Sequence, residues 1–489
     1  MTTVPAAASH RAILARAVAV DLACAGALLI ACAWQLHDLE RVLDLAPWDE
    51  ADYLRRGLVI PMRGLPPAEW GPLYALWYFL LSRAQPDRIA LYYLSYRLLV
   101  ALPALAVFGC ARRMGISPAI ALLGALAFLL SAAPYIVPRP TLLALLIVLA
   151  ALGAAARMRR SELAYAVMGI ALLLGAFARP ELFASFLIVS AALAVALVWR
   201  VRRSPFAITR SPQMIPALLR SSGIAVAYAA ASLSLLAVFG NPLGREDGRR
   251  LYAFCQHFAV GEVARRGLDL EPWGQCDAVM QRTFGAVKSI GEAARRNPSA
   301  FLTHLVDNLR QYPVESAALI LRGLGGARAD EGPWTSKRVA HLTALALITG
   351  ACGWGMARDR RRRSSRATSP SVWRAGLVVA AVLVPSIASA IVLQPRSHYL
   401  ALQAVLVPLF ALTWASQQRT LEFEQRSVEV IRASPVLRSR QLVSAFPPDL
   451  RAVALATFVA VSAPQVFQHS PAEAPLPNLA VVRYLEAEA

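Results

Sequence analysis

Apolar runs close to the length of a bilayer span recur along this chain, and they constrain its fold more than any other feature. A transmembrane helix needs ~20 mainly apolar residues. The runs that approach this length are approximately Val18–Trp34, Tyr92–Ala111, Pro118–Ala133, Thr141–Ala156, Leu163–Ala178, Glu181–Trp199, Gly223–Phe239, Val339–Met356, Ala375–Leu393, Tyr399–Ser416 and Ala452–Val466. Because 57% of the 489 residues are hydrophobic and only 16% are charged, the sequence predicts an all-α polytopic membrane protein with about eleven transmembrane helices.

Arginine-rich loops set the expected orientation. Five basic segments fall on one side of the predicted spans: Arg112-Arg113, Arg157–Arg160, Arg200–Arg203, Arg358–Arg366 and Gln417–Leu450. Because short cytoplasmic loops carry an excess of Lys and Arg, we expect these loops and the N-terminus inside the cell, and the C-terminus outside the inner (plasma) membrane. Asp21 within the first apolar run argues against a cleaved signal peptide.

The net charge of +20 follows from the same loops. The arginines form short clusters between apolar runs and do not form one basic domain. We therefore expect contacts with anionic membrane lipids, and no nucleic acid as a partner.

Two predicted outer segments are long, and they define the domain organisation. The first carries Gly71–Ser82, which is too short to span the bilayer and is expected to be an interfacial helix. The second is too long for a connector and should carry structure of its own. The expected parts are a transmembrane module, 1–239, with the first outer loop at 35–91; a large, partly helical outer loop, 240–338; C-terminal transmembrane helices, 339–466; and an outer tail, 467–489.

Within the second outer segment, Asn297-Pro298 is typical of a helix start. The predicted helix runs to Leu309 and is stopped by Pro313. Phe301, Leu302, Leu305, Val306 and Leu309 would form its apolar stripe.

The cysteines indicate one disulfide. Cys255 and Cys276 lie in the same outer segment, in an oxidising compartment, so a bridge is favoured over two free thiols. No pair has the spacing of a zinc site. Because there is also no phosphate-cradling Gly-rich motif and no Gly-x-Ser-x-Gly, nucleotide-driven chemistry has no support in the sequence.

An acidic stretch, Trp48-Asp49-Glu50-Ala51-Asp52-Tyr53, follows the first apolar run. On a helix starting near Pro47, Asp49 and Asp52 share one face, as do Glu50 and Tyr53. Acidic groups are favoured in a first helical turn by the helix dipole. The stretch is compatible with an interfacial loop that has an aromatic anchor, or with a group of catalytic carboxylates.

Charged residues also stand at the predicted outer ends of later spans: Arg139, Arg179, Glu181, Arg396 and His398. A single arginine in such a place commonly snorkels to the interface. Several on the side where positive charge is not favoured indicate a site instead. Together with the acidic stretch, they predict an outward cavity with acids for an acceptor and arginines for a phosphate.

The order of these features resembles the GT-C membrane glycosyltransferases, the superfamily of protein O-mannosyltransferases (glycosyltransferase family 39) and lipid A aminoarabinose transferases. The acidic stretch is similar to the family's Asp-Glu-x-x-Tyr in the first outer loop. Gly71-Pro72-Leu73-Tyr74 is similar to the Pro-Pro-Leu-Tyr stretch that opens an interfacial helix, Tyr96-Arg97 to an arginine-led second span, and Arg396-Ser397-His398-Tyr399 to a late Arg-Tyr-Leu motif. The resemblance covers roughly Ala17–Trp199 well and the remainder loosely.

The resemblance implies a GT-C-like architecture and transfer of a sugar from a polyprenyl-phosphate donor. The acceptor would be a hydroxyl of a protein, glycolipid or polysaccharide, and the anomeric centre would be inverted. Asp49 would be the general base. Glu50 would orient the acceptor or bind a divalent cation; no other cofactor is implied.

The remaining candidates divide between the two substrates. Arg179, Arg396 and Arg139 would bind the donor phosphate, whereas Asp52, Tyr53, Glu181 and His398 would contact the acceptor. One departure concerns metal binding, because many members carry a second acid between the third and fourth spans. Here Arg139-Pro140-Thr141 stands in that place, which puts a metal site of that type in doubt.

Two other function classes stay open at this level. One is a transporter or flippase for lipid-linked or small solutes, which would favour Gly- or Pro-broken helices at corresponding positions of two halves; we find no such pairing. The other is a non-catalytic membrane scaffold with a GT-C fold. The sequence names neither the sugar nor the acceptor.

Overall fold

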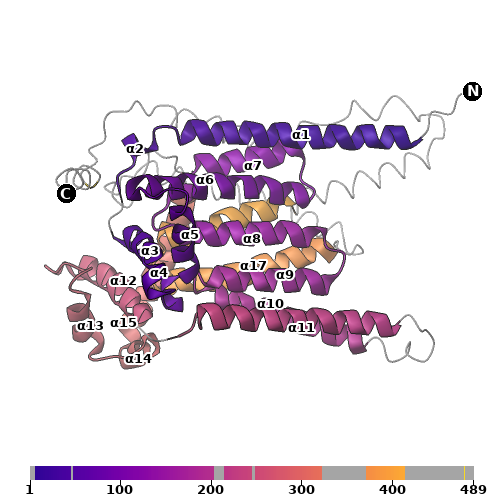
Figure 1. Ribbon diagram of the computed structural model, residues 1–489. Helices are drawn as coiled ribbons and strands as arrows, with labels where there is room; N and C mark the ends of the chain where they lie inside the picture. Colours follow the sequence, from indigo (N-terminus) through magenta and orange to yellow (C-terminus); the bar gives the residue numbers. More distant parts are fainter. Residues whose placement is uncertain are drawn as a thin grey trace, which may run out of the picture.

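The computed structural model describes residues 6–45, 48–202, 214–244, 248–321, 370–413 and 478, and within these ranges the chain is helical and has no β-strand. Most of its apolar helices lie side by side in one bundle (Figure 1). They are α1 (Ala6–Gln35), α6 (Arg88–Arg113), α7 (Pro118–Leu130), α8 (Pro140–Arg157), α9 (Ser161–Ala176), α10 (Leu182–Arg202), α11 (Met214–Phe239) and α17 (Pro370–Val392). A further helix, Ser397–Thr413, follows α17.

Six of the described helices are long and apolar enough to cross a membrane, judged by length and composition. The prediction of a helical multi-pass membrane protein is confirmed at this level. Three other runs predicted as spans form shorter apolar helices, namely α7, α9 and Ser397–Thr413. Because a helix rises about 1.5 Å per residue, the 13 residues of α7 cover only ~20 Å. The predicted spans Val339–Met356 and Ala452–Val466 lie outside the described residues.

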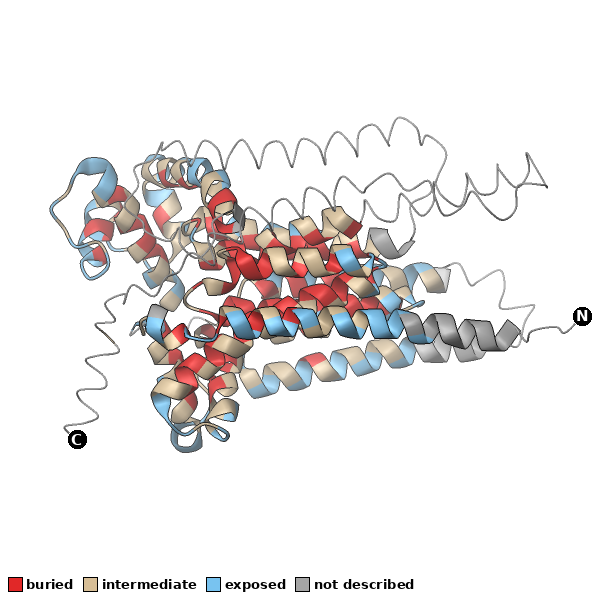
Figure 2. Ribbon diagram, turned by 90° about the horizontal axis from the view of Figure 1, so that it is seen from above, coloured by how far each residue is buried: buried red, intermediate tan, exposed pale blue. Residues whose placement is uncertain are grey.

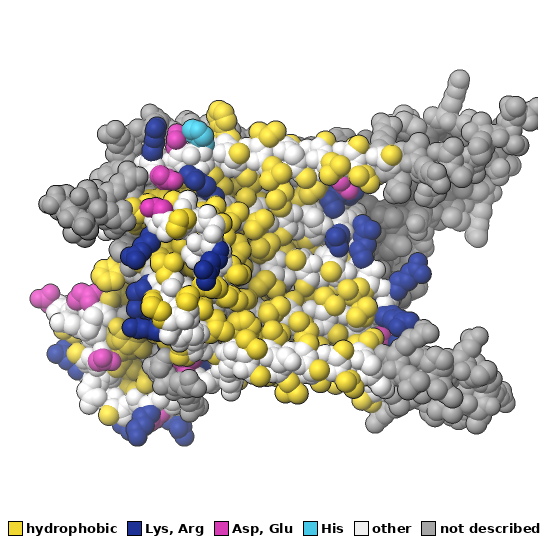
Figure 3. Space-filling model, in the orientation of Figure 1, with side chains coloured by type: hydrophobic (Ala, Val, Ile, Leu, Met, Phe, Trp, Pro, Cys, Tyr) yellow, Lys and Arg dark blue, Asp and Glu magenta, His cyan; other side chains and the backbone are white. Residues whose placement is uncertain are grey.

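Burial divides the bundle into a packed centre and an exposed shell (Figure 2). In the most apolar window of α8, 67% of the residues are buried, but only 11% in that of α1 and 6% in that of α11. Figure 3 shows hydrophobic side chains across the middle of the bundle and charged ones towards both ends. Such a large exposed apolar surface is rare on a soluble protein, and it fits the hydrocarbon core of a bilayer.

A second, smaller core lies in a lobe beside one end of the bundle (Figure 1). The lobe consists of α12 (Arg249–Arg266), α13 (Cys276–Phe284), α14 (Ile290–Arg296) and the first half of α15 (Pro298–Leu321). Its buried side chains include Phe254, Phe258 and Phe284. The structure therefore agrees with the expectation that the second outer segment carries structure of its own.

The predicted end of α15 is wrong. Asn297 caps the helix as expected, because its Oδ1 accepts a hydrogen bond of 3.1 Å from the Ala300 N–H. The helix, however, continues through Pro313 to Leu321. A proline inside a helix costs ~3 kcal/mol, but Ala317 and Leu319 beyond it are buried, and Leu319 packs in the core of the bundle. Burial of this apolar turn offsets the lost hydrogen bond.

Short helices cover the same end of the bundle, which we call the lobe end. They are α2 (Leu39–Val42), α3 (Asp49–Leu58), α4 (Ile60–Arg63), the 3₁₀ helix η1 (Ala68–Trp70), α5 (Pro72–Ser82) and the 3₁₀ helix η2 (Ala133–Tyr135). The predicted short helix at Gly71–Ser82 is α5. Gly57 of α3 allows α5 to pack closely on it, because a Cβ atom at this position would stand 2.6 Å from the Ala75 carbonyl oxygen. Gly71, in the left-handed region at φ 60°, permits the sharp start of α5.

Candidate functional site

Glu50 and Arg139 meet inside the protein. Both side chains are fully buried, and an Arg139 guanidinium nitrogen lies 3.3 Å from Glu50 Oε1. The phenols of Tyr74 and Tyr78 each donate a hydrogen bond of 2.5 Å to the same oxygen, and the Arg139 backbone N–H donates one of 2.9 Å to Oε2. This carboxylate therefore has a full set of internal partners.

Aromatic rings complete the environment of the Arg139 guanidinium. Its central carbon lies 4.6 Å from the centre of the Tyr92 ring and 4.2 Å from that of Tyr96. Such cation–π contacts are strongest where water is excluded. The sequence predicts that Arg139 and Glu50 face an outward cavity, and this needs correction because both are buried. They neutralise each other and join α3 to the start of α8.

The other two acids of the acidic stretch differ in how they are paired. Asp52 accepts hydrogen bonds from Arg55 at 2.7 Å and from Arg56 at 2.6 Å. Partial burial opposes its ionisation, but these two arginines outweigh burial and hold the pKa of Asp52 below its usual value. Asp49, the first residue of α3, is exposed, and within the described part of the chain it has no ion pair. Of the three acids, Asp49 alone combines exposure with a free carboxylate.

Arg179 and Glu181 form a second internal pair. The Arg179 Nε donates a hydrogen bond of 2.8 Å to Glu181 Oε1, and a terminal nitrogen lies 2.6 Å from the same atom. The Arg179 side chain is nearly buried, and its guanidinium stands 4.8 Å from the centre of the Tyr399 ring. Arg179 thus lies at the lobe end, and its charge is already matched by Glu181.

Arg396 is exposed, and no ion pair in the described ranges includes it. Its guanidinium lies 4.8 Å from the centre of the Trp273 ring, which comes from the lobe. The ring of His257 lies edge-on to both Trp273 and Tyr399, with centroids 5.7 and 5.9 Å away. Burial, and then the charge of Arg396, lowers the pKa of His257 to about 4. His257 is therefore neutral near pH 7, and Arg396 carries the charge.

His398 is buried beside this group and does not face an acceptor as expected. Its backbone carbonyl accepts a hydrogen bond of 2.8 Å from the Thr141 hydroxyl, and its ring packs on that of Tyr399 at 4.2 Å. His398 therefore links the helix Ser397–Thr413 to the start of α8 and supports Tyr399.

The structure adds one arginine that the sequence did not single out. Arg249, the first residue of α12, donates a hydrogen bond of 3.1 Å to the Tyr53 hydroxyl and one of 3.3 Å to the Glu69 carbonyl. Its guanidinium lies 3.8 Å from the centre of the Trp70 ring. No described carboxylate pairs with it. In the sequence nothing separates Arg249 from its neighbour Arg250, because the choice depends on the fold of the lobe.

Tyr399 lies near these cations, with the Arg179 guanidinium 4.8 Å from the centre of its ring. The charges of Arg179, Arg249 and Arg396 all act on its phenol, together with that of Glu181. Three guanidinium groups and one carboxylate leave an excess of positive charge at this point. We call these three arginines and Tyr399 the cationic cluster. Chemically, the cluster can hold an anion by hydrogen bonds from guanidinium groups and a phenol.

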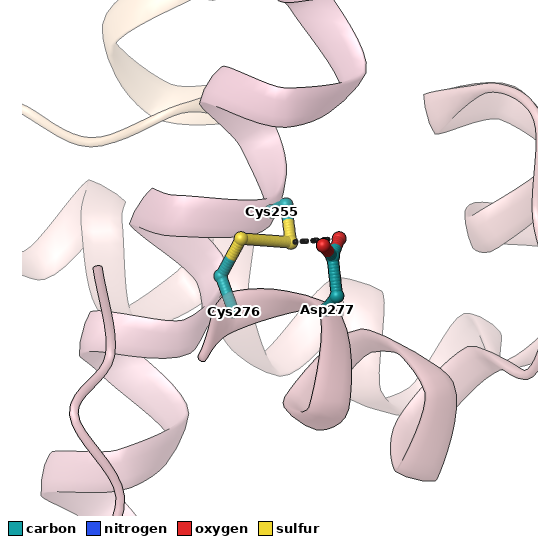
Figure 4. Close-up of side chains that lie close together, drawn as sticks. All are labelled: Cys255, Cys276 and Asp277. Atoms are coloured by element: carbon teal, nitrogen blue, oxygen red, sulfur yellow. Dashed lines mark hydrogen bonds between the residues drawn. A yellow bond between two sulfur atoms is a disulfide. The ribbon is translucent and has the colours of Figure 1, made fainter. Parts of the chain in front are cut away.

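The described residues do not bring the acids together as a metal centre. The ligand-type atoms of Cys255, Cys276 and Asp277 lie within 4.8 Å of one another, as Figure 4 shows. Cys255 and Cys276, the pair expected from the sequence, are joined by a disulfide, with the Asp277 carboxylate 3.5 Å from Cys255 Sγ. Because metals bind thiolates and not disulfides, this group is a covalent link between α12 and α13. Cys352 lies outside the described residues.

A small cavity lies elsewhere, at the opposite end of the bundle. It is lined by residues of α8, α9 and α17, among them Leu152, Met168 and Arg374. The cationic cluster, and not this apolar cavity, carries the polar groups that could bind a charged substrate.

Comparison with known proteins found no matching family model, no similar curated protein and no similar solved structure. The likeness of the acidic stretch to GT-C enzymes thus stays a resemblance of motifs.

Proposed function

We propose that this protein is an integral membrane glycosyltransferase with a GT-C-like architecture and eleven spans. It would transfer a sugar from a polyprenyl-phosphate donor to an acceptor hydroxyl on the extracytoplasmic side. One observation carries the proposal: a free, exposed carboxylate, Asp49, lies at the same end of an apolar bundle as two guanidinium groups without carboxylate partners, Arg249 and Arg396.

The charge of the cationic cluster supports a phosphate donor. A polyprenyl-phosphate sugar is a phosphodiester with one negative charge. When its bond to the sugar breaks, the lipid phosphate leaves as a monoester that gains a second charge. Arg249 and Arg396 provide two positive charges that no acid among the described residues neutralises, and such groups stabilise the charge that develops in the transition state. Arg179 contributes less, because Glu181 already matches its charge.

Asp49 is the proposed general base. It would accept the proton of the acceptor hydroxyl as the oxygen attacks the anomeric carbon, and a single displacement would invert that centre. Asp49 lies one helical turn before Tyr53, which Arg249 contacts, so base and phosphate site share the start of α3. Glu50 does not take this role, because its oxygens are occupied by Tyr74, Tyr78 and Arg139.

The position of the site suits a lipid-linked donor. Trp48, next to Asp49, is 84% exposed, and tryptophan is enriched at membrane interfaces. A carboxylate beside such an anchor would lie at the depth of a lipid phosphate, with the prenyl chain in the hydrocarbon region. This placement distinguishes the proposal from a transferase that uses a soluble nucleotide sugar.

The test is a transfer assay with the purified full-length protein in lipid nanodiscs. Undecaprenyl-phosphate donors carrying different radiolabelled sugars are incubated with envelope extracts as acceptors, and both labelled acceptor and released undecaprenyl phosphate are measured. The proposal expects at least one donor to be cleaved by the wild type and not by Asp49→Asn. If the donors stay intact but cross the bilayer of proteoliposomes, the protein is a transporter and the proposal fails.

A further inference from the structure

Arg396 is held at two points by one closed loop of the lobe. The loop runs from Cys255 to Cys276, and the disulfide joins its ends. The Trp273 ring of this loop supports the Arg396 guanidinium at 4.8 Å. The second point is in the backbone: the Arg396 N–H donates a hydrogen bond of 2.8 Å to the Gln394 carbonyl, and the Gln394 amide oxygen lies 3.0 Å from His257 Nδ1.

The turn that presents Trp273 is itself well fixed. The Glu271 carboxylate accepts hydrogen bonds from the backbone N–H groups of Trp273, at 3.0 Å, and Gly274. The Gln275 side chain accepts one of 3.0 Å from the Glu271 N–H. Gln256, next to Cys255, donates a hydrogen bond of 3.3 Å to the Trp273 carbonyl. The turn is therefore joined to α12 both by this bond and by the disulfide.

An exposed arginine binds a ligand more tightly when its side chain is already ordered. The long side chain loses considerable rotamer entropy when it binds a ligand. An aromatic surface that already orders the guanidinium removes part of this loss. Trp273 carries no charge, and its single neutral N–H is a weaker donor to a phosphate than a guanidinium, so its main effect on an anion would act through Arg396.

We infer that Trp273 is a positioning residue for Arg396, and that the disulfide-closed loop 255–276 sets the affinity of the cationic cluster for a lipid-linked phosphate. This inference rests on the proposed function for its ligand. It assigns a role in substrate binding to the lobe, which does not supply the proposed base.

The experiment measures the affinity of the purified full-length protein for undecaprenyl phosphate by calorimetry in detergent. Trp273→Ala is expected to weaken binding about tenfold, and Trp273→Phe, which keeps an aromatic face, to restore it to within about threefold of the wild type. Cys255→Ser/Cys276→Ser should weaken binding to a similar degree as Trp273→Ala. Trp34→Ala, an exposed tryptophan on α1, is the matched control and should bind like the wild type.

A double-mutant cycle separates positioning from general damage to the fold. If Trp273 acts through Arg396, then Trp273→Ala adds little to the loss caused by Arg396→Gln. Losses that multiply in the double variant would overturn the inference, and so would full affinity of Trp273→Ala. If the wild type itself does not bind undecaprenyl phosphate, the proposed donor class fails, and the inference fails with it; normal wild-type binding with an inert Trp273 refutes the inference alone.

Discussion

Glu50 and Arg139 lie 89 positions apart in the sequence and form a fully buried ion pair at 3.3 Å. The pair joins the first helical turn of α3, where Asp49 begins the helix, to the residue that precedes α8. The position of Asp49 therefore depends on two charged residues that do not reach solvent. We infer that this ion pair stabilises the packing of the lobe end.

Breaking this pair on one side should destabilise the protein strongly. Removing one partner leaves a buried charge without its counter-ion, which costs ~3–5 kcal/mol. We therefore expect Glu50→Gln and Arg139→Met each to lower the thermal unfolding temperature markedly in detergent. The double variant should lose much less than the sum of the two, because no uncompensated charge remains. Equal and additive losses would show that the two residues do not act as a pair.

Asp49 and Asp52 provide a matched test of the catalytic assignment. Asp49→Asn keeps the size of the side chain but cannot accept the proton of the acceptor, so turnover should fall by ~10²–10⁴-fold. Asp52→Asn removes only partly exposed ion pairs with Arg55 and Arg56 and should change turnover far less. The measurement is sugar transfer from the donor identified in the nanodisc assay. A normal Asp49→Asn beside an inactive Asp52→Asn would exclude the assignment.

Much of the bundle could be predicted from the sequence because apolar runs report directly on helices in a membrane protein. The order of the described helices follows the predicted runs, and the short helix α5 and the start of α15 directly after Asn297 also agree. The end of α15 could not be predicted, since local chemistry stops a helix near Pro313 while burial of Leu319 in the bundle continues it. Long-range packing decided that boundary.

The site was harder to predict, for a similar reason. The sequence singles out Asp49, Arg179 and Arg396 as candidate site residues, but it cannot say which charges neutralise each other. Arg139 is paired with Glu50 only because the turn before α8 packs against α3. Arg249 joins the cluster only because the lobe presents α12 to Trp70. Partner choice between distant segments is a property of the fold.

Arg249 and Arg250 are adjacent on α12 and allow the cationic cluster to be tested at constant net charge. Arg249→Gln should weaken binding of undecaprenyl phosphate by roughly tenfold or more, because a charge-assisted hydrogen bond is lost. Arg250 is exposed and donates to the Pro242 carbonyl, so Arg250→Gln should bind nearly as well as the wild type. Calorimetry with both variants is the measurement. Equal losses would mean that only the overall charge of the lobe matters.

His257 should make the lobe sensitive to acid. Its pKa is about 4 in the folded protein, below the ordinary value of 6.5, so folding favours the neutral ring. The resulting stability is fully present above pH 6.5 and is lost as the pH falls towards 4, by ~3 kcal/mol in total. His304 in α15, whose pKa burial also lowers, contributes in the same direction.

The comparison is between the wild type and His257→Gln, which keeps a hydrogen-bond donor towards Gln394 but does not titrate. We expect the unfolding temperature of the wild type to fall more between pH 6.5 and pH 4.5 than that of His257→Gln. Tryptophan fluorescence can follow the transition, since Trp273 lies against His257. Parallel curves for the two proteins would contradict the role of His257.

The last prediction concerns orientation, and the basic loop Arg157–Arg160 supports it. Both ends of the bundle carry paired arginines, as in Arg296 with Glu292 at the lobe end and Arg200 with Glu162 at the other. At the other end, Arg157, Arg159 and Arg160 are exposed, and no described acid pairs with them. Short cytoplasmic loops of membrane proteins carry an excess of Lys and Arg. We therefore expect a cysteine placed at Ser299, exposed in the lobe, to react with an impermeant reagent in intact cells, and one at Arg159 to react only after the membrane is opened. The reverse pattern would place the cationic cluster in the cytoplasm, where a donor presented on the outer face could not reach it.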